Sequence, residues 1–188
     1  MNQIRSDYAY LEVLDKRTYK RNRKYINKFH SCRFPGGETF LREEASLYLD
    51  KDKKYVTYLV KKLGDDDILA YFALSAGAIF WDPYGNIKSN PTIEISYYSL
   101  NDKYAMENGK GIGLGKLIFE DFILPTIRSI NETLGISFIT LFAINTKKDK
   151  VKKAYEKMGF IYPGEDIQDY IQYRDVESCY LMYRRINS

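Results

Sequence analysis

The chain has 188 residues, 45% of them hydrophobic and 29% charged, with a formal net charge of +4, which predicts a single globular domain over residues 1–188. No run approaches the roughly eighteen apolar residues that cross a bilayer, and the N-terminus lacks the layout of a signal peptide. Two distant cysteines, Cys32 and Cys179, and one histidine, His30, argue against a zinc site, so we expect a cytoplasmic, metal-free protein.

The first third of the chain predicts one strand and two helices. Residues 4–14 alternate loosely and favour a strand, and residues 17–29 read as a basic helix. Residues 38–52 place apolar side chains at helical spacing after a "PGG" entry. The dense positive charge from Lys16 to His30 is compatible with a solvated helix face, with an anionic ligand or with nucleic acid.

The middle of the chain predicts antiparallel strands. Residues 55–63 alternate and carry β-branched and aromatic side chains, and Gly64 to Asp67 form a turn signal. The apolar run "ILAYFALSAGAIF" follows, so the two segments predict a hairpin. Residues 92–100 alternate Ile93 and Ile95 against polar neighbours and predict a third strand.

The last part of the chain alternates helices with strands. A long amphipathic helix is expected from about Gly113 to Leu134, with a bend or break at Pro125. Residues 136–144 predict a buried strand, residues 149–160 a short helix capped by Gly159, and residues 177–186 a final strand. The order predicts an α/β (α+β mixed) fold: a mixed, mostly antiparallel sheet, parallel near the glycine-rich segment, with helices on both faces.

The glycine-rich segment "NGKGIGLGKLIF", Asn108 to Phe119, lies between a strand and a helix start. Bare backbone there lets a phosphate approach the unpaired N–H groups of the first helical turn. A Walker loop would need Ser or Thr where Leu117 stands, and a dinucleotide-binding loop would belong to a first βαβ unit. A merely flexible turn accounts poorly for four glycines.

A third kind of phosphate-binding loop fits better. "KGIGLGK" resembles the acyl-CoA pyrophosphate loop of the GNAT superfamily of N-acetyltransferases, starting at either Lys110 or Asn108. "EISYYSL" before the loop resembles the central strand of that family, and "VKKAYEKMGF" resembles its later signature, so the resemblance covers roughly Asp67 to Phe160. The N-terminal part is similar to a bacterial branch that includes aminoacyl-tRNA-acetylating toxins.

The resemblance implies acetyl-CoA as acyl donor, no metal, and roles for particular residues. Tyr155 would be the general acid at the coenzyme sulfur and Glu94 the general base, although Glu94 could also be an exposed strand residue. Loop amides would hold the pyrophosphate, β-strand backbone would pair with the pantetheine and supply an oxyanion donor, and an asparagine would bond the pantetheine arm. The implied coenzyme-binding residues are Ser99, Leu100, Lys110, Gly111, Ile112, Gly113, Leu114, Gly115, Lys116 and Asn145.

The sequence leaves three functions open. The leading one is direct transfer of acetyl from acetyl-CoA to a primary amine of a small molecule, peptide or protein, in a ternary complex. The alternatives are a tRNA-engaging toxin that acetylates aminoacyl-tRNA and a non-catalytic acyl-CoA-binding regulator. Direct transfer needs no enzyme nucleophile, so we assign none to His30 or Cys32. A homodimer through residues 177–186 is an expectation.

Overall fold

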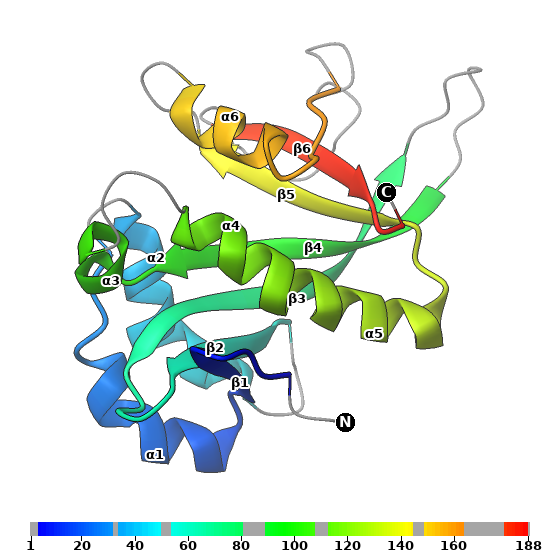
Figure 1. Cartoon of the computed structure of the whole chain (residues 1–188). Helices are drawn as coiled ribbons and strands as arrows, with labels where there is room; N and C mark the ends of the chain where they lie inside the picture. Colours follow the sequence, from blue (N-terminus) through cyan, green and yellow to red (C-terminus); the bar gives the residue numbers. More distant parts are fainter. Residues whose placement is uncertain are drawn as a thin grey trace. The chain divides into compact units, whose positions relative to one another are not determined.

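A computed structural model describes residues 4–31, 34–49, 54–80, 89–107, 113–144, 149–163 and 179–187. Six strands form one sheet in the order β1-β2-β3-β4-β5-β6 (Figure 1). They are β1 Ala9–Val13, β2 Val56–Lys62, β3 Ile68–Phe80, β4 Ser89–Leu100, β5 Phe138–Ile144 and β6 Cys179–Arg185. The helical segments are α1 Lys16–Ile26, α2 Pro35–Thr39, η1 Phe40–Glu44, η2 Ala45–Tyr48, α3 Asp102–Glu107, α4 Leu114–Ile118, η3 Phe119–Ile123, α5 Leu124–Leu134 and α6 Lys150–Glu156. The predicted mixed, mostly antiparallel sheet is confirmed, with β4 and β5 as its parallel pair.

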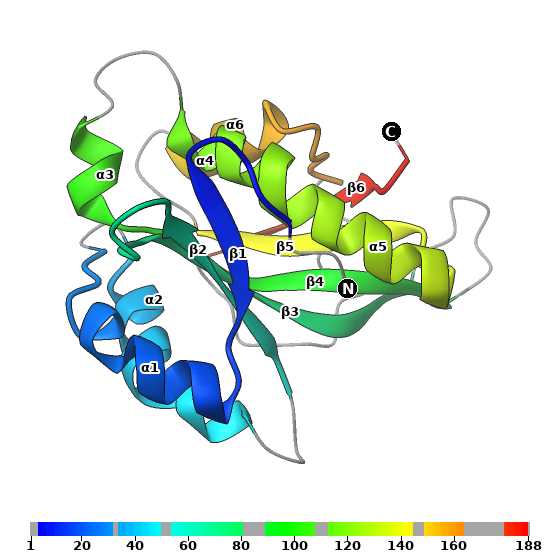
Figure 2. The same ribbon diagram turned by 60° about the horizontal axis from the view of Figure 1, so that its bottom comes forward.

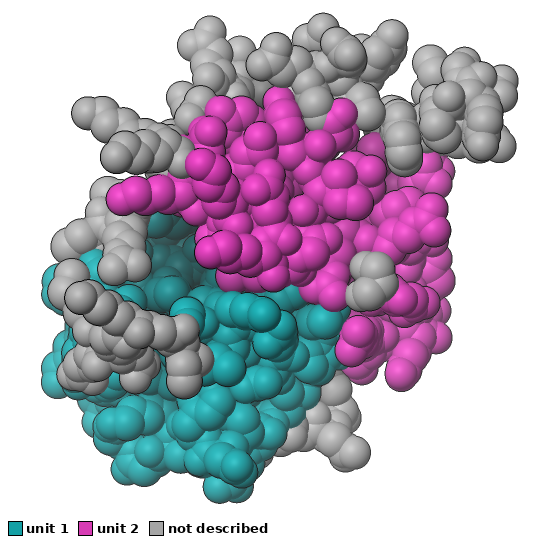
Figure 3. Space-filling view, turned by 45° about the horizontal axis from the view of Figure 1, so that its top comes forward, with its two compact units in different colours: residues 1–75, 96–126 teal, residues 76–95, 127–188 magenta. Residues whose placement is uncertain are grey.

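The chain divides into two compact units, coloured separately in Figure 3. The first comprises Met1–Ser75 and Ser96–Thr126, and the second comprises Ala76–Ile95 and Ile127–Ser188. Strands β3 and β4 each contribute residues to both units. The expectation of a single domain over residues 1–188 therefore stays a prediction.

The first unit contains the predicted antiparallel hairpin. β1 pairs with β2 from Ala9 opposite Lys62, and β2 pairs with β3 from Val56 opposite Leu74, with a register shift between Val60 and Lys61. Consecutive residues of β2 point to opposite faces of the sheet. Because five consecutive residues of β2 are buried, both faces of the sheet are covered at this strand.

One face of this hairpin carries an aromatic core shared with the N-terminal helices. Figures 1 and 2 both show α1 and α2 together on the same side of β1 and β2. The ring of Phe40 stacks on that of Tyr97 with centroids 3.7 Å apart, and the hydroxyl of Tyr71 donates a 2.5 Å hydrogen bond to the carbonyl of Gly37. A Cβ at Gly37 would lie 2.6 Å from the Phe34 ring, which explains the glycine in the "PGG" entry. The buried residues of this core are Leu14, Ile26, Phe29, Phe40, Leu41, Ala45, Tyr55, Leu59, Ile68, Tyr71 and Ala73.

The helix predicted over residues 38–52 begins earlier and is irregular. It starts at Pro35, continues as the π-turn η1 and ends in the 3₁₀ segment η2. Phe40 and Leu41 are consecutive and both fully buried. A π-turn widens the helix by one residue, so two adjacent side chains can point into the core. Helix α3 follows β4 directly and was not predicted.

The predicted interruption near Pro125 is confirmed. The helical segment after the glycines passes through the π-turn η3 before α5 begins at Leu124. Proline has no N–H, and its ring collides with the carbonyl four residues earlier, here that of Asp121. The π-turn contains Asp121 and so relieves that collision within the helix.

The second unit is built on β5 and β6. The parallel pairing of β4 with β5 runs from Thr92 opposite Phe138 to Ile95 opposite Leu141. β5 pairs with β6 antiparallel along its whole length. Within the part of the chain that is described, no helix is long and apolar enough to cross a membrane. The homodimer through residues 177–186 stays a prediction.

Candidate active site

The start of α4 is the described part of the glycine-rich loop. Gly113 caps the helix in an extended conformation, and its carbonyl accepts hydrogen bonds from the N–H groups of Lys116, at 2.7 Å, and Leu117, at 3.2 Å. A Cβ built at Gly113 would meet no atom within 4 Å, whereas Leu114 is buried and fixes the helix start to the core. Residues 108–112 lie outside the described residues, including Lys110, Gly111 and Ile112. The register of the loop is therefore untested.

Lys116 is one of the coenzyme-binding residues that the resemblance implies. Its side chain is half exposed and its ammonium lies 3.5 Å from the carboxylate of Glu120, one helical turn later. Such exposed pairs contribute little to stability and rearrange readily, so Lys116 can reach toward an anion.

A tyrosine joins the loop to strand β4. The hydroxyl of Tyr98 donates a 2.6 Å hydrogen bond to the carbonyl of Gly115. This bond brings the end of β4, with Ser99 and Leu100, close to the start of α4. Sequence reasoning missed Tyr98 because the alternation of β4 gives only the face of a side chain and not the main-chain atom that it reaches.

The end of β4 is anchored to the rest of the first unit. The Ser99 hydroxyl donates a 2.7 Å hydrogen bond to that of Ser31, and both side chains are buried. The next buried residue, Asn101, donates to β3 through its main chain, to Leu69 O at 2.8 Å, and through its side chain, to Ile68 O at 2.9 Å. The predicted backbone positions Ser99 and Leu100 are thus held in a fixed place.

The one histidine belongs to an ion-pair cluster. The Nδ1 of His30 lies 3.5 Å from a carboxylate oxygen of Glu38, which also binds the Arg42 guanidinium at 2.7 Å. The other carboxylate oxygen of Glu38 accepts from Ser31 N at 2.9 Å. This cluster joins α2 and η1 to the segment after α1. Cys32 lies outside the described residues.

In the second unit, Tyr155 lies on α6. The helix ends at Glu156, and the predicted cap residue Gly159 closes the turn after it: Gly159 adopts a left-handed conformation with φ +84°, and Phe160 N donates back to Tyr155 O at 3.1 Å. The Tyr155 ring meets the Phe160 ring edge-on, with centroids 5.7 Å apart. Burial raises the pKa of the Tyr155 hydroxyl to about 12, so the hydroxyl keeps its proton at neutral pH.

Strand β6 holds α6 at both ends. A guanidinium nitrogen of Arg184 donates a 2.7 Å hydrogen bond to Met158 O, and the Tyr180 hydroxyl donates to a carboxylate oxygen of Asp149 at 3.3 Å. A Cβ at Gly159 would lie 3.3 Å from Arg184 Nε, so glycine lets the guanidinium approach the helix end. Sequence reasoning named Gly159 as a cap but missed Arg184.

We expect Arg184→Gln to lower kcat about tenfold and to leave KM for acetyl-CoA within twofold, because α6 would lose its hydrogen bond at Met158 and Tyr155 would be less precisely placed. Steady-state kinetics on thiol release would measure both constants. Arg185→Gln removes the same charge from an exposed neighbour and should behave as wild type. A wild-type kcat in Arg184→Gln would show that the bond to Met158 O does not position Tyr155.

Glu94 is half-buried on β4 and lies opposite Thr140 in the parallel register. On the same face, Thr92 Oγ1 and Thr140 Oγ1 lie 3.2 Å apart in a buried hydrogen bond. A Cβ at Gly77 would lie 2.7 Å from Thr92 Oγ1 and 3.7 Å from Glu94 Cβ. The glycine in "SAGAIF" on β3 therefore leaves room for the side chains of Thr92 and Glu94 on β4. Asn145 lies outside the described residues, in which no group of metal-ligating side chains occurs.

Comparison with known proteins places the fold. No protein-family model and no curated protein matches the chain. Solved structures do match. The KacTA–DNA complex matches at 17% identity over 94% of each chain, with a TM-score of 0.65. AtaTR bound with acetyl-CoA matches at 16% identity over 97% of this chain and 96% of that one, with a TM-score of 0.64. AtaT complexed with acetyl-methionyl-tRNAfMet matches at 14% over 95% of each chain, with a TM-score of 0.60. At such identities the likeness establishes architecture, and the chain has the fold of the GNAT N-acetyltransferases.

Proposed function

We propose that the chain is an acetyl-CoA-dependent N-acetyltransferase whose acceptor is the α-amine of aminoacyl-tRNA. The observation that carries the proposal is the likeness over nearly the whole length to AtaT structures that hold acetyl-CoA and acetyl-methionyl-tRNAfMet. The helix start at Leu114, the strand β4 and Tyr155 on α6 are elements of the type that the resemblance implies, which supports the coenzyme-binding part of the proposal.

In the proposed reaction the acceptor nitrogen bonds to the acetyl carbonyl carbon, the carbon–sulfur bond breaks, and coenzyme A leaves as a thiol. The proton lost by nitrogen balances the proton gained by sulfur. Tyr155 would donate a hydrogen bond to the departing sulfur, and its raised pKa keeps that donor protonated at neutral pH. Main-chain N–H groups at the end of β4, near Leu100, would stabilise the oxyanion. Those from Gly113 to Gly115, at the start of α4, would face the pyrophosphate.

The pKa of the acceptor amine determines whether the reaction needs Glu94 as a general base. An α-amine has a pKa of about 7.7–8.0 and is half neutral near pH 8, whereas an alkyl amine has a pKa of about 10.4 and needs a base. Glu94, on the part of β4 that belongs to the second unit, is the candidate base.

A transfer assay with labelled acetyl-CoA should therefore compare charged tRNA, uncharged tRNA and a polyamine as acceptors. Label in charged tRNA alone supports the proposal, and label in the polyamine alone supports the broader amine reading. If no thiol is released with any acceptor, the chain is a non-catalytic binder.

Glu94→Gln separates the two acceptor readings further. With aminoacyl-tRNA at pH 8 we expect kcat to fall less than fivefold. With an alkyl-amine acceptor we expect a loss of about 10²–10⁴-fold, because a general base contributes that much. Measuring kcat for both acceptors checks this, with Glu156→Gln on exposed α6 surface as the matched control. A large loss with aminoacyl-tRNA would contradict a weakly basic acceptor.

A further inference from the structure

Helix α1 presents a strongly basic surface on a rigid support. Asp15 caps the helix: its carboxylate accepts from Thr18 N at 2.7 Å while the Thr18 hydroxyl accepts from Asp15 N at 2.6 Å. Asn22 and Ile26 are fully buried and fix the inner side of the helix to the sheet. The helix therefore keeps its outer side chains in fixed register.

The outer side chains form what we call the α1 basic face, consisting of Arg17, Lys20, Arg23, Lys24 and Lys28, all exposed. Arg17, Lys20 and Lys24 follow at helical spacing and line one stripe. No acidic residue occurs between Lys16 and Gly37. A helix that only needs solubility ordinarily mixes both signs of charge, because like charges one turn apart repel.

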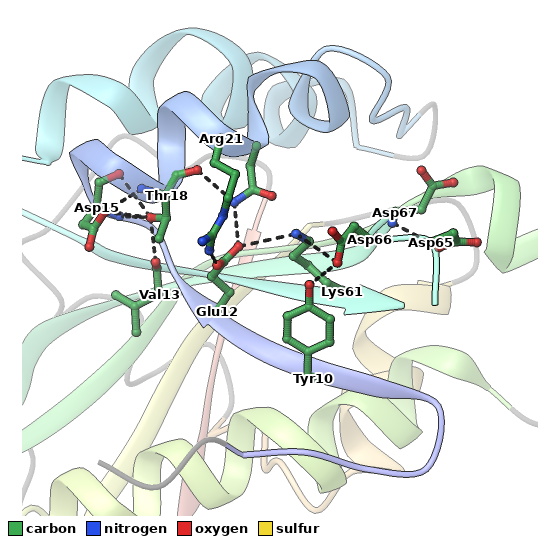
Figure 4. A network of polar contacts seen from close by, with 11 residues as sticks. Tyr10, Glu12, Val13, Asp15, Thr18, Arg21, Lys61, Asp65, Asp66 and Asp67 are labelled. Carbon is green, nitrogen blue, oxygen red and sulfur yellow. Dashed lines mark hydrogen bonds and ion pairs between the residues drawn. The ribbon is translucent and has the colours of Figure 1, made fainter. Parts of the chain in front are cut away.

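The nearby carboxylates are already engaged, as Figure 4 shows. Glu12 binds the Arg21 guanidinium, accepts from Asn22 Nδ2 at 2.6 Å, and lies 3.5 Å from the buried ammonium of Lys61. Asp66 binds the same ammonium at 3.5 Å and accepts from the Tyr10 hydroxyl. Hydrogen bonds from Thr18 hold the pKa of Asp15 below its usual range. Among the described residues, none of the five cations of the α1 basic face forms an ion pair.

The chemistry of this face selects one class of partner. Its aromatic neighbours, Tyr19 and Tyr25, are half-buried and pack against the core, so the outer side of α1 offers no apolar stripe for a membrane. A protein interface would need an apolar centre, which the face also lacks. Long cations on one helical stripe match the regular negative charge of a phosphate backbone.

We propose that the α1 basic face binds the phosphate backbone of RNA, which would hold an aminoacyl-tRNA acceptor on the enzyme. This inference rests on the proposed function for the identity of the RNA but not for the existence of the surface. The network around Glu12 and Lys61 serves the interaction by joining α1 firmly to β1 and β2, so that binding costs little ordering of the helix.

The test measures RNA affinity against salt for the full chain. In the triple variant Arg17→Gln, Lys20→Gln and Lys24→Gln, the slope of log affinity against log salt should fall by about 2–3, because each phosphate contact contributes about 0.7–0.9. The control variant Arg5→Gln, Lys54→Gln and Arg128→Gln removes the same charge from scattered exposed positions. It should keep the wild-type slope. Melting temperature and acetyl-CoA affinity establish that both variants are folded.

The outcomes separate the surface from the reaction. If the triple variant keeps the wild-type slope while the wild type acetylates aminoacyl-tRNA, the inference is overturned and the proposed function stands. If the slope falls but no aminoacyl-tRNA is acetylated by the wild type, the surface stands and the proposed function fails. Binding of polyglutamate in place of RNA, lost in the triple variant, would overturn the inference in favour of an acidic protein partner.

Discussion

Tyr155→Phe should lower kcat by about 10²–10⁴-fold, the usual contribution of a positioned proton donor, and leave acetyl-CoA affinity nearly unchanged. Phenylalanine keeps the edge-on contact with Phe160 and removes only the hydroxyl. Stopped-flow measurement of thiol release would give the rate, and calorimetry the affinity.

The pH profile adds a second test of the same residue. The pKa of Tyr155 is raised to about 12, so the hydroxyl stays protonated from acid to mildly alkaline pH. Removing it should lower the whole rate profile without moving either limb below about pH 10. Tyr162→Phe, which deletes a hydroxyl from the same unit, is the matched control. Full activity in Tyr155→Phe would refute the role of proton donor.

Glu12→Leu should destabilise the fold by about 3 kcal/mol, because it leaves the Lys61 ammonium buried with less compensation. The Lys61 side chain is only 2% exposed, and in the described part of the chain its carboxylate partners are Glu12 and Asp66. Lys61→Met should cost less, since Glu12 keeps Arg21 and Asn22. The double variant should come close to the wild type, as buried pairs replaced by apolar side chains often do.

Urea denaturation of the four proteins completes the cycle. Burial already lowers the pKa of Lys61, so the folded chain binds its proton less tightly than the unfolded chain. Glu12→Leu removes a carboxylate 3.5 Å from the ammonium, a charge that favours the protonated form. The destabilisation should therefore shrink as the pH rises toward 10.5 and the ammonium loses its proton. Additive effects of the two single substitutions would show that the two charges do not interact.

The order and type of most elements could be predicted from the sequence, because their signals are local. Alternation in residues 55–63 and 92–100 depends only on which face each side chain occupies, and Pro125 and Gly159 restrict the backbone wherever they occur. The π-turn at Phe40 could not be predicted, since it arises from burying two adjacent side chains in a core formed by distant strands. Helix α3 was missed although Asn101 gives it a local start signal: the Asn101 side chain accepts from Lys103 N at 3.2 Å, and its carbonyl accepts from Tyr104 N and Ala105 N. The helix is only six residues long, too short for an apolar periodicity to show in the sequence.

Only those residues of the candidate site that belong to a sequence motif could be predicted. Tyr155, Gly113 and Lys116 were named as candidates from their place in "KGIGLGK" and "AYEKMGF", and their roles stay predictions. The residues that hold them in place have no such signal: Tyr98 reaches a carbonyl 17 positions later, and Arg184 reaches one 26 positions earlier. Those contacts depend on tertiary packing. The roles of Tyr155 and Glu94 stay predictions until the variants are measured.

The hydrogen bond from Tyr98 to Gly115 has a consequence for how the loop can change. Its acceptor is a main-chain carbonyl, which every amino acid possesses, so the tether does not depend on the side chains that follow the glycines. Replacing Lys116 or Leu117 would alter what the loop contacts without releasing it from β4. Substitutions acquired in nature or by directed evolution could therefore change which ligand the loop prefers while the loop keeps its position beside β4.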